Sequence, residues 1–166
     1  MKSLNFEPVK STEEFRKNYR LHDLAEYHGK NLFMQWGIDF TDYGKDKRFE
    51  RVWEKGADKP DIVAEYDNIK FLVDWKGKSK GDFWVNKRAL DSYNNWSSKL
   101  KLEVIICFFV FNKKNQMQDR RFALLSKHNS NLVEKDAWDK NKIISFGKDL
   151  PAFNKFNLTR FLQSTK

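Results

Sequence analysis

Two aspartates and a lysine near the middle of the chain are the residue types that divalent-metal chemistry requires. Residues 60–76 are predicted to form two β-strands joined by a turn at residues 67–68, because Ile, Val, Phe and Tyr favour strands and Asp-Asn favours turns. A two-residue turn places Asp61 opposite Asp74, with Cβ atoms roughly 4.5–5.5 Å apart. Lys76 follows Asp74 by two residues and projects from the same face. The register therefore predicts that two carboxylates and an ammonium group meet at one end of a hairpin.

Such a group of charges suits a bound metal ion. Facing carboxylates repel each other, and a hard cation removes that repulsion. Mg²⁺ binds oxygen ligands at about 2.0–2.1 Å, often one or two carboxylates together with waters and phosphate oxygens. The ammonium of Lys76 can hold an attacking water or offset charge on a phosphoryl transition state, so the three residues suit phosphodiester hydrolysis. The alternative is an ordinary hairpin with a solvated end, in which Lys76 alone compensates for the two acids.

The same residues resemble the signature of the PD-(D/E)xK nuclease superfamily. That signature is Pro-Asp, a strand-turn-strand interval, and then an acid, any residue and lysine. Here it is Pro60-Asp61, followed 13 residues later by Asp74-Trp75-Lys76. The resemblance implies a restriction-endonuclease-like α/β fold: a three-layer core with a central mixed β-sheet flanked by helices.

The resemblance also implies roles for these residues. Asp61 and Asp74 are expected to be catalytic and to bind Mg²⁺, for which Mn²⁺ can substitute. The backbone carbonyl of Trp75 is a further expected metal ligand, while its side chain is predicted to face the core. Lys76 is expected to be the catalytic lysine.

A helix is predicted before the hairpin, from the capping-box pattern of residues 11–14 to a stop at Gly37. Superfamily members often carry a further acid on such a helix. The resemblance therefore makes Glu26 the candidate third acid, catalytic and bound to the metal or its waters. The alternative for Glu26 is a solvated surface residue, and Asp23 and Glu50 are the reserve candidates.

Basic residues after the hairpin are the predicted contacts to nucleic acid. A flexible loop is predicted over residues 77–81 and a helix over residues 84–99. The predicted phosphate contacts are Lys78, Lys80, Lys87 and Arg88. Such contacts position a nucleic-acid strand without reading its base sequence. The basic segment 44–59 is a further candidate, for which plain solvated surface is the alternative.

The remaining pattern completes the α/β prediction. The nearly continuous apolar run at residues 102–111 predicts a strand buried on both faces. Further strands are predicted over residues 121–126 and, as an edge strand, 142–146. A short closing helix is predicted over residues 157–162, with Asn157 as its N-cap.

Composition and charge restrict the class of protein. The 166 residues fit one domain, so a single nuclease domain over residues 1–166 is expected. The net charge of +9 is consistent with an anionic partner, and the hairpin makes DNA the expected one. No apolar run is long enough to span a membrane, so no membrane partner is expected. The lone Cys107, expected to be buried, and the lack of a signal-peptide pattern favour a cytoplasmic location, which includes a virus-encoded protein in a host cytoplasm.

The expected function is that of a divalent-metal-dependent DNA endonuclease with no small-molecule cofactor besides the metal. The resemblance extends to compact branches such as archaeal Holliday-junction resolvases and phage nucleases. A junction-specific resolvase needs two active sites and therefore a homodimer. A non-catalytic nucleic-acid-binding module and an RNA-directed nuclease are also compatible with these residues.

Overall fold

The computed structural model describes residues 12–43, 59–128, 131–133 and 142–164. The elements in chain order are α1 (Thr12–Trp36), β1 (Asp39–Asp42), β2 (Ile62–Tyr66), β3 (Ile69–Lys78), β4 (Trp84–Asn86), α2 (Lys87–Leu100), β5 (Glu103–Phe111), β6 (Met117–Leu124), β7 (Asn131–Val133), β8 (Ile143–Ser145) and α3 (Lys155–Gln163). Among the described residues, no helix has both the length and the apolarity needed to span a bilayer.

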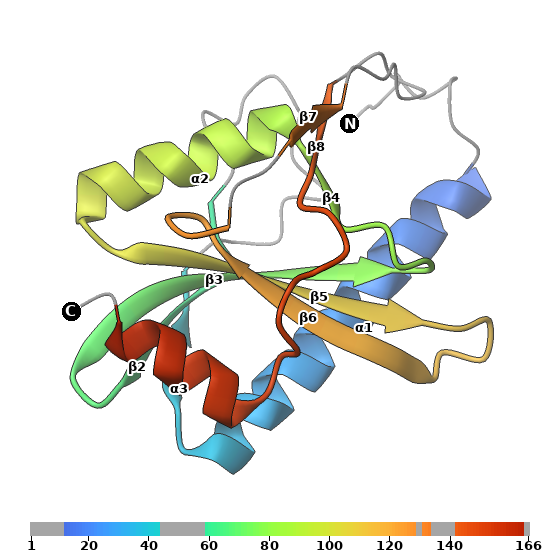
Figure 1. Ribbon diagram of the computed structural model, residues 1–166. Coiled ribbons are helices and arrows are strands. Elements are labelled where there is room, and N and C mark those ends of the chain that lie inside the picture. Colours follow the sequence, from blue (N-terminus) through green and yellow to red (C-terminus); the bar gives the residue numbers. More distant parts are fainter. Residues whose placement is uncertain (1–11, 44–58, 129–130, 134–141, 165–166) are drawn as a thin grey trace.

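The strands form two sheets, and the larger one is the centre of three layers. Its order is β1-β2-β3-β5-β6, in which β3 and β5 run parallel and the other neighbours antiparallel. The smaller sheet has the order β4-β8-β7. Helix α2 and the smaller sheet cover one face of the larger sheet, and α1 and α3 cover the other (Figure 1). The predicted α/β fold, a mixed central sheet flanked by helices, is confirmed.

The β2–β3 hairpin has the register predicted from its turn. Tyr66 pairs with Ile69, and the ladder extends to Ile62 opposite Val73. The turn residues 67 and 68 have φ angles of 53° and 65°. Two left-handed residues give a turn whose twist matches that of the strands, and Asp and Asn tolerate this conformation better than most residues. The local sequence of the turn therefore sets which residues of the two strands lie opposite each other.

Strand β3 is longer than predicted. Gly77 and Lys78 were predicted to begin a flexible loop, but they extend the strand because β5 provides parallel partners for them. Trp75 is fully buried in the apolar cluster beneath α1. Asp74 and Lys76 lie on the other face of the sheet, beside α2, where Lys76 contacts a residue of that helix. The two faces of this strand thus have different chemistry.

Two glycines let α1 approach β3 closely. A Cβ atom added at Gly29 would overlap the indole ring of Trp75, and one added at Gly77 would overlap the backbone carbonyl of Leu21. The helix ends as predicted at Gly37, whose φ of +76° suits glycine. This close contact fixes α1 across the half of β3 that carries the predicted site.

Several element boundaries differ from the predictions. Residues 84–86 form β4 rather than the first turn of a helix, because they pair with β8. The N-cap of α3 is Asn154, whose Oδ1 accepts a hydrogen bond from the backbone N–H of Asn157 (2.8 Å), so Asn157 is not the cap. The strand predicted over residues 142–146 as an edge is β8, the middle strand of the smaller sheet. In each case a partner distant in sequence overrides the local pattern.

Strand β5 is the buried centre of the larger sheet. Every residue after Glu103 is buried, as the apolar run predicted. Cys107 is fully buried, and burial followed by the charges of Asp74 and Asp61 raises the pKa of its thiol well above the ordinary value. It behaves as the predicted buried residue. The partner strand β6 begins at Met117, four residues before the predicted start.

Candidate active site

Asp61 directly precedes β2, and its side chain is held against β3. Its backbone N–H donates to the carbonyl of Val73 (2.9 Å), although Val73 is already the ladder partner of Ile62, so the regular pairing ends one residue before Asp61. Its Oδ2 accepts a hydrogen bond from the backbone N–H of Trp75 (2.8 Å). Its own carbonyl accepts one from the backbone N–H of Tyr43 (2.8 Å). Backbone contacts from two neighbouring segments therefore position Asp61 beside the strand that carries Asp74.

Asp74 and Lys76 lie together on the α2 side of the sheet, as the two-residue period of a strand predicts. Asp74 is 4% exposed, and its Oδ2 lies 3.0 Å from Nζ of Lys76. The same Nζ is 3.5 Å from the hydroxyl of Tyr93 and 5.8 Å from the centre of its ring. Tyr93 is buried on α2, so this helix helps to hold the ammonium beside Asp74.

The two carboxylates form an environment that favours a bound cation. Burial and the adjacent charge of Asp74 raise the pKa of Asp61 well above its ordinary value, although the N–H of Trp75 and the charge of Lys76 act in the opposite direction. Oδ2 of Asp74 is buried and makes no hydrogen bond, although it is close to the Lys76 ammonium. A divalent cation would relieve both penalties, since hard cations bind carboxylate oxygens. These residues therefore fit Mg²⁺ or Mn²⁺.

The backbone of Trp75 offers another oxygen at the same edge. The N–H and C=O of one strand residue point toward the same neighbour. The N–H of Trp75 points to Asp61, the residue just before β2 begins. Its C=O consequently points to the same edge, which is compatible with the predicted ligand role. The indole ring packs in the core against Phe33 and Phe109, as predicted.

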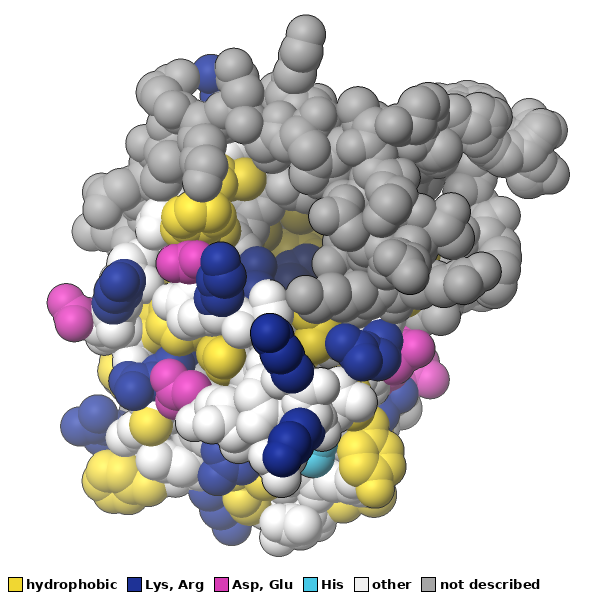
Figure 2. Space-filling view, turned by 90° about the vertical axis from the view of Figure 1, so that its right-hand side faces the viewer, with side chains coloured by type: hydrophobic (Ala, Val, Ile, Leu, Met, Phe, Trp, Pro, Cys, Tyr) yellow, Lys and Arg dark blue, Asp and Glu magenta, His cyan; other side chains and the backbone are white. Residues whose placement is uncertain are grey.

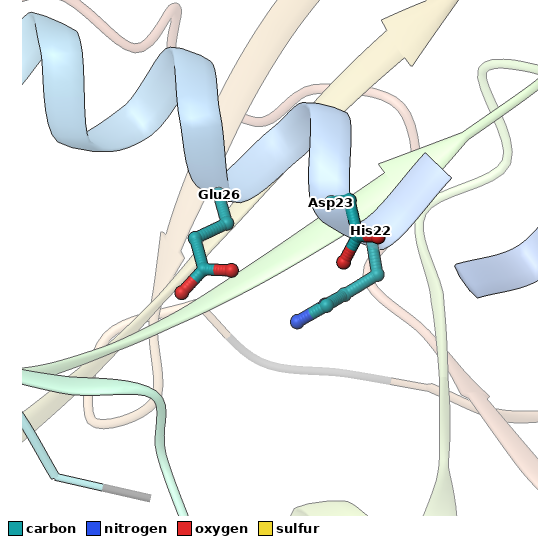
Figure 3. A group of neighbouring side chains, drawn as sticks. All are labelled: His22, Asp23 and Glu26. Carbon is teal, nitrogen blue, oxygen red and sulfur yellow. The ribbon is translucent and has the colours of Figure 1, made fainter. Parts of the chain in front are cut away.

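Glu26 lies on α1 in a cluster with His22 and Asp23. The three side chains leave the same side of the helix (Figure 3), and their potential ligand atoms lie within 4.8 Å of one another. Among the residues that the structure describes, these are the three potential metal-binding side chains whose ligand atoms all lie within that distance of one another. Glu26 therefore does not form an equally compact trio with Asp61 and Asp74.

Glu26 is nevertheless connected to the edge of the sheet that holds Asp61. Its Oε2 lies 3.0 Å from Nζ of Lys30, and that ammonium donates a hydrogen bond of 2.9 Å to Asp42 at the end of β1. The residue after Asp42 is the one that bonds the carbonyl of Asp61. The third-acid role of Glu26 stays a prediction. The reserve candidate Glu50 lies outside the described residues.

Lys78, one of the predicted phosphate contacts, is less accessible than a loop lysine. It lies in β3, and its Nζ donates to the backbone carbonyl of Trp84 (2.6 Å) and lies 5.9 Å from the centre of the Phe108 ring. Burial, followed by the nearby charge of Lys76, lowers the pKa of Lys78 from 10.5 to about 8. The ammonium therefore links β3 to β4, and its contribution to a phosphate contact stays a prediction.

The other three predicted phosphate contacts are closer to solvent. Lys80 and Arg88 are exposed. Lys87 is partly exposed and forms an ion pair of 2.8 Å with Asp91 one helical turn later. Lysine and arginine side chains are also spread over the face that includes the β5–β6 turn, among polar groups and small hydrophobic patches (Figure 2). The basic segment considered as a further contact lies outside the described residues except for Lys59.

Two neighbours of the site were not predicted from the sequence. Tyr93 contacts the catalytic lysine candidate, and the backbone of Tyr43 contacts Asp61. The signal for Tyr93 was its place on the apolar stripe of α2, which we expected only to pack on the sheet. Nothing in the local sequence indicated the contact made by Tyr43, because it depends on how β1 pairs with β2.

Comparisons with known proteins leave the function to be argued from this geometry. No family model matches the chain. No curated protein matches it. Among solved structures, the chain is similar to Hjc, a Holliday junction resolvase from the archaeal hyperthermophile Archaeoglobus fulgidus, determined at 1.6 Å resolution. That match has 11% sequence identity, a TM-score of 0.49, and covers 73% of this chain and 85% of that chain. A similarity this low does not identify an activity.

Proposed function

We propose that the protein is a divalent-metal-dependent nuclease that hydrolyses phosphodiester bonds in DNA, and that residues 1–166 form its single domain. The observation that carries this proposal is the pair of Asp61 and Asp74 carboxylates, with the ammonium of Lys76 3.0 Å from Asp74. Two adjacent acids in a buried setting are unfavourable for folding unless a cation binds them. A perturbed carboxylate with specific charged partners is typical of a functional site.

Each residue of the site has a role in this proposal. Asp61, Asp74 and the carbonyl of Trp75 hold the metal, and Glu26 contributes through a water. When bound, Mg²⁺ or Mn²⁺ would supply Lewis-acid polarisation of the scissile phosphate. The ammonium of Lys76 orients the attacking water and donates to phosphoryl oxygens as their negative charge grows. The hydroxyl and ring of Tyr93 position that ammonium.

The basic residues beside the site bind the substrate backbone. Lys80, Lys87 and Arg88 neutralise phosphates at the surface, and Lys78 adds positive potential from within β3. Binding of this kind weakens as salt rises, because each neutralised phosphate releases counterions. Affinity for DNA is therefore expected to fall steeply with ionic strength.

A cleavage panel tests the proposal. Purified protein is incubated with plasmid, linear duplex, single-stranded and four-way-junction DNA and with RNA, in Mg²⁺, Mn²⁺ or EDTA. Metal-dependent cleavage is expected for the wild type and is expected to disappear in Asp74→Asn. Asp149→Asn, at an exposed residue between β8 and α3, is the matched control and is expected to cleave normally. Cleavage that survives in Asp74→Asn would refute the proposed site.

The panel also distinguishes the enzyme from a binding module and DNA from RNA as substrate. A non-catalytic binding module cleaves none of the substrates, and its binding survives chelation. An RNA-directed enzyme cleaves only the RNA. Junction resolution requires two active sites, so junction-specific cleavage should be accompanied by a dimeric mass in sedimentation.

A further inference from the structure

An aromatic and cationic cluster lies beside the proposed active site and has no part in the proposed mechanism. The rings of Tyr43 and Trp96 meet edge to face, with centroids 5.6 Å apart and planes at 89°. Nζ of Lys59 lies 5.4 Å from the centre of the Tyr43 ring and 5.2 Å from that of Trp96. Nζ of Lys99 lies 5.0 Å from the centre of the Trp96 ring. Two rings and two ammonium groups thus gather at one point of the surface.

This cluster is next to the catalytic acids. The backbone N–H of Tyr43 donates to the carbonyl of Asp61 (2.8 Å). Trp96 follows Tyr93 by three residues on α2, so the two side chains lie on the same side of the helix. Tyr93 contacts Lys76, and Trp96 contacts Tyr43. Helix α2 therefore makes successive contacts with Lys76 and with the segment that positions Asp61.

The cluster is not a closed piece of core. Tyr43 and Trp96 are only partly buried, and Lys59 and Lys99 are exposed. The contact between an exposed lysine and an aromatic ring is weak, so a ligand can replace it. These features are more typical of a binding surface than of helix packing alone.

We propose that these four residues bind an unpaired nucleotide next to the scissile phosphate. Its base stacks on the face of the partly exposed Trp96 ring, with Tyr43 meeting that ring edge to face, while Lys59 and Lys99 move off the indole to pair with the flanking phosphates. Stacking on aromatic side chains along a basic surface is how proteins bind single strands without reading their sequence. A base inside a duplex is already stacked on its neighbours and cannot bind in this way. The inference rests on the proposed nuclease function and narrows its substrate to nucleic acid with an unpaired strand at the active site.

The test measures binding in EDTA by fluorescence anisotropy, with three labelled DNA probes. These are a thymidine oligonucleotide, an abasic oligonucleotide of equal length and a blunt duplex. The wild type is expected to bind the thymidine probe at least about tenfold more tightly than the abasic probe. Trp96→Leu is expected to remove most of this preference and leave abasic binding nearly unchanged. Lys99→Gln is expected to lower the affinity for both single-stranded probes equally. It should also reduce the slope of log affinity against log salt concentration by about one.

Matched variants control for folding. Trp96→Phe keeps a ring at the same place and is expected to retain most of the preference. Phe156→Leu removes a ring that is 71% exposed on α3, on the opposite side of the sheet, and is expected to change nothing. Thermal melting shows whether Trp96→Leu is folded, and the retained abasic binding shows that its basic surface is intact.

Two binding results would overturn the inference. One is a preference for the thymidine probe that persists in Trp96→Leu, and the other is tighter wild-type binding to the blunt duplex than to the single strand. Because binding is measured without metal, failure of the proposed nuclease function can be distinguished from failure of this binding site. A protein that shows the predicted preference but cleaves nothing retains this binding site and loses the nuclease proposal. A protein that cleaves only duplex retains the nuclease proposal and loses this site.

Discussion

Neighbouring residues of β3 serve opposite faces of the sheet. Trp75 is fully buried in the α1 face, where its ring meets Phe33 with centroids 5.3 Å apart. Asp74 is almost as buried on the α2 face, but its Oδ2 has no hydrogen bond and lies beside the Lys76 ammonium. The α1 face of this strand is apolar, while the α2 face carries the charges of Asp74 and Lys76 beside an apolar cluster of its own.

This difference shows how one strand can combine stability with chemistry. The two-residue period separates the side chains by face, so close packing of α1 against Trp75 does not exclude charges at the neighbouring positions. Local rules of packing and charge pairing are commonly violated at functional sites and compensated elsewhere. Substitutions on the two faces should therefore affect different quantities.

The largest expected effect is the loss of cleavage in Asp61→Asn, by at least about 10³-fold. The same substitution should raise the melting temperature in EDTA at neutral pH. The raised pKa of Asp61 means that the folded protein releases this proton at higher pH than the unfolded chain, so stability falls as pH rises from about 4 toward that pKa. An amide does not titrate and still accepts the hydrogen bond from Trp75. Initial rates and melting curves across pH measure both effects. A lower melting temperature of the variant in EDTA at neutral pH would contradict the repulsion between the carboxylates of Asp61 and Asp74.

Lys76→Met should lower the cleavage rate by about 10²-fold and change substrate affinity little, because the ammonium acts mainly on the transition state. In EDTA the variant should melt at a lower temperature, since the buried Asp74 carboxylate loses its ionic partner. Saturating Mg²⁺ should restore most of that loss. Lys127→Met removes an exposed lysine and serves as the control. Comparable rates for the two variants would argue against a catalytic role for Lys76.

Gly77→Ala tests the α1 face and should destabilise the protein by about 1–3 kcal/mol, because the added methyl overlaps the backbone of Leu21 and not a flexible side chain. Gly81→Ala is the matched control, since a Cβ there meets no atom within 4 Å. Urea unfolding gives both free energies. Equal stability of the two variants would show that α1 does not approach β3 as closely as described.

A further expected effect, seen only in the pH dependence of stability, concerns Lys78. Its pKa of about 8 lies below the ordinary value of 10.5, so between these values the unfolded chain binds a proton that the folded protein does not. The free energy of unfolding of the wild type should therefore receive a contribution from Lys78 that increases as the pH rises through that range. Lys78→Met should remove this pH dependence. The urea midpoints of both proteins, measured from pH 7 to 10.5, report this difference. Parallel curves would show that Lys78 is not desolvated.

The part of the site within one hairpin was predictable. Asp-Asn in a two-residue turn sets the register of the ladder from Tyr66–Ile69 to Ile62–Val73, and the two-residue period puts Lys76 on the same face as Asp74. Asp61 lies one residue beyond that ladder and reaches β3 through its side chain, which accepts the N–H of Trp75. The parts that depend on distant partners were not predictable. The helical pattern over residues 84–99 was wrong at its start, because Val85 pairs with Ile144 in the smaller sheet. That pairing has no trace in the local periodicity.

The sequence by itself determined the fold class, the hairpin and the convergence of two acids with a lysine. These follow from turn conformation and from the two-residue period, both of which act over short distances along the chain. Only the tertiary structure decided which groups surround them: the hydroxyl of Tyr93, the burial of Lys78 and the Tyr43–Trp96 cluster. The physical reason is that each of these depends on how α2 and the outer strands pack across the sheet, and packing between distant segments is not encoded in any local pattern.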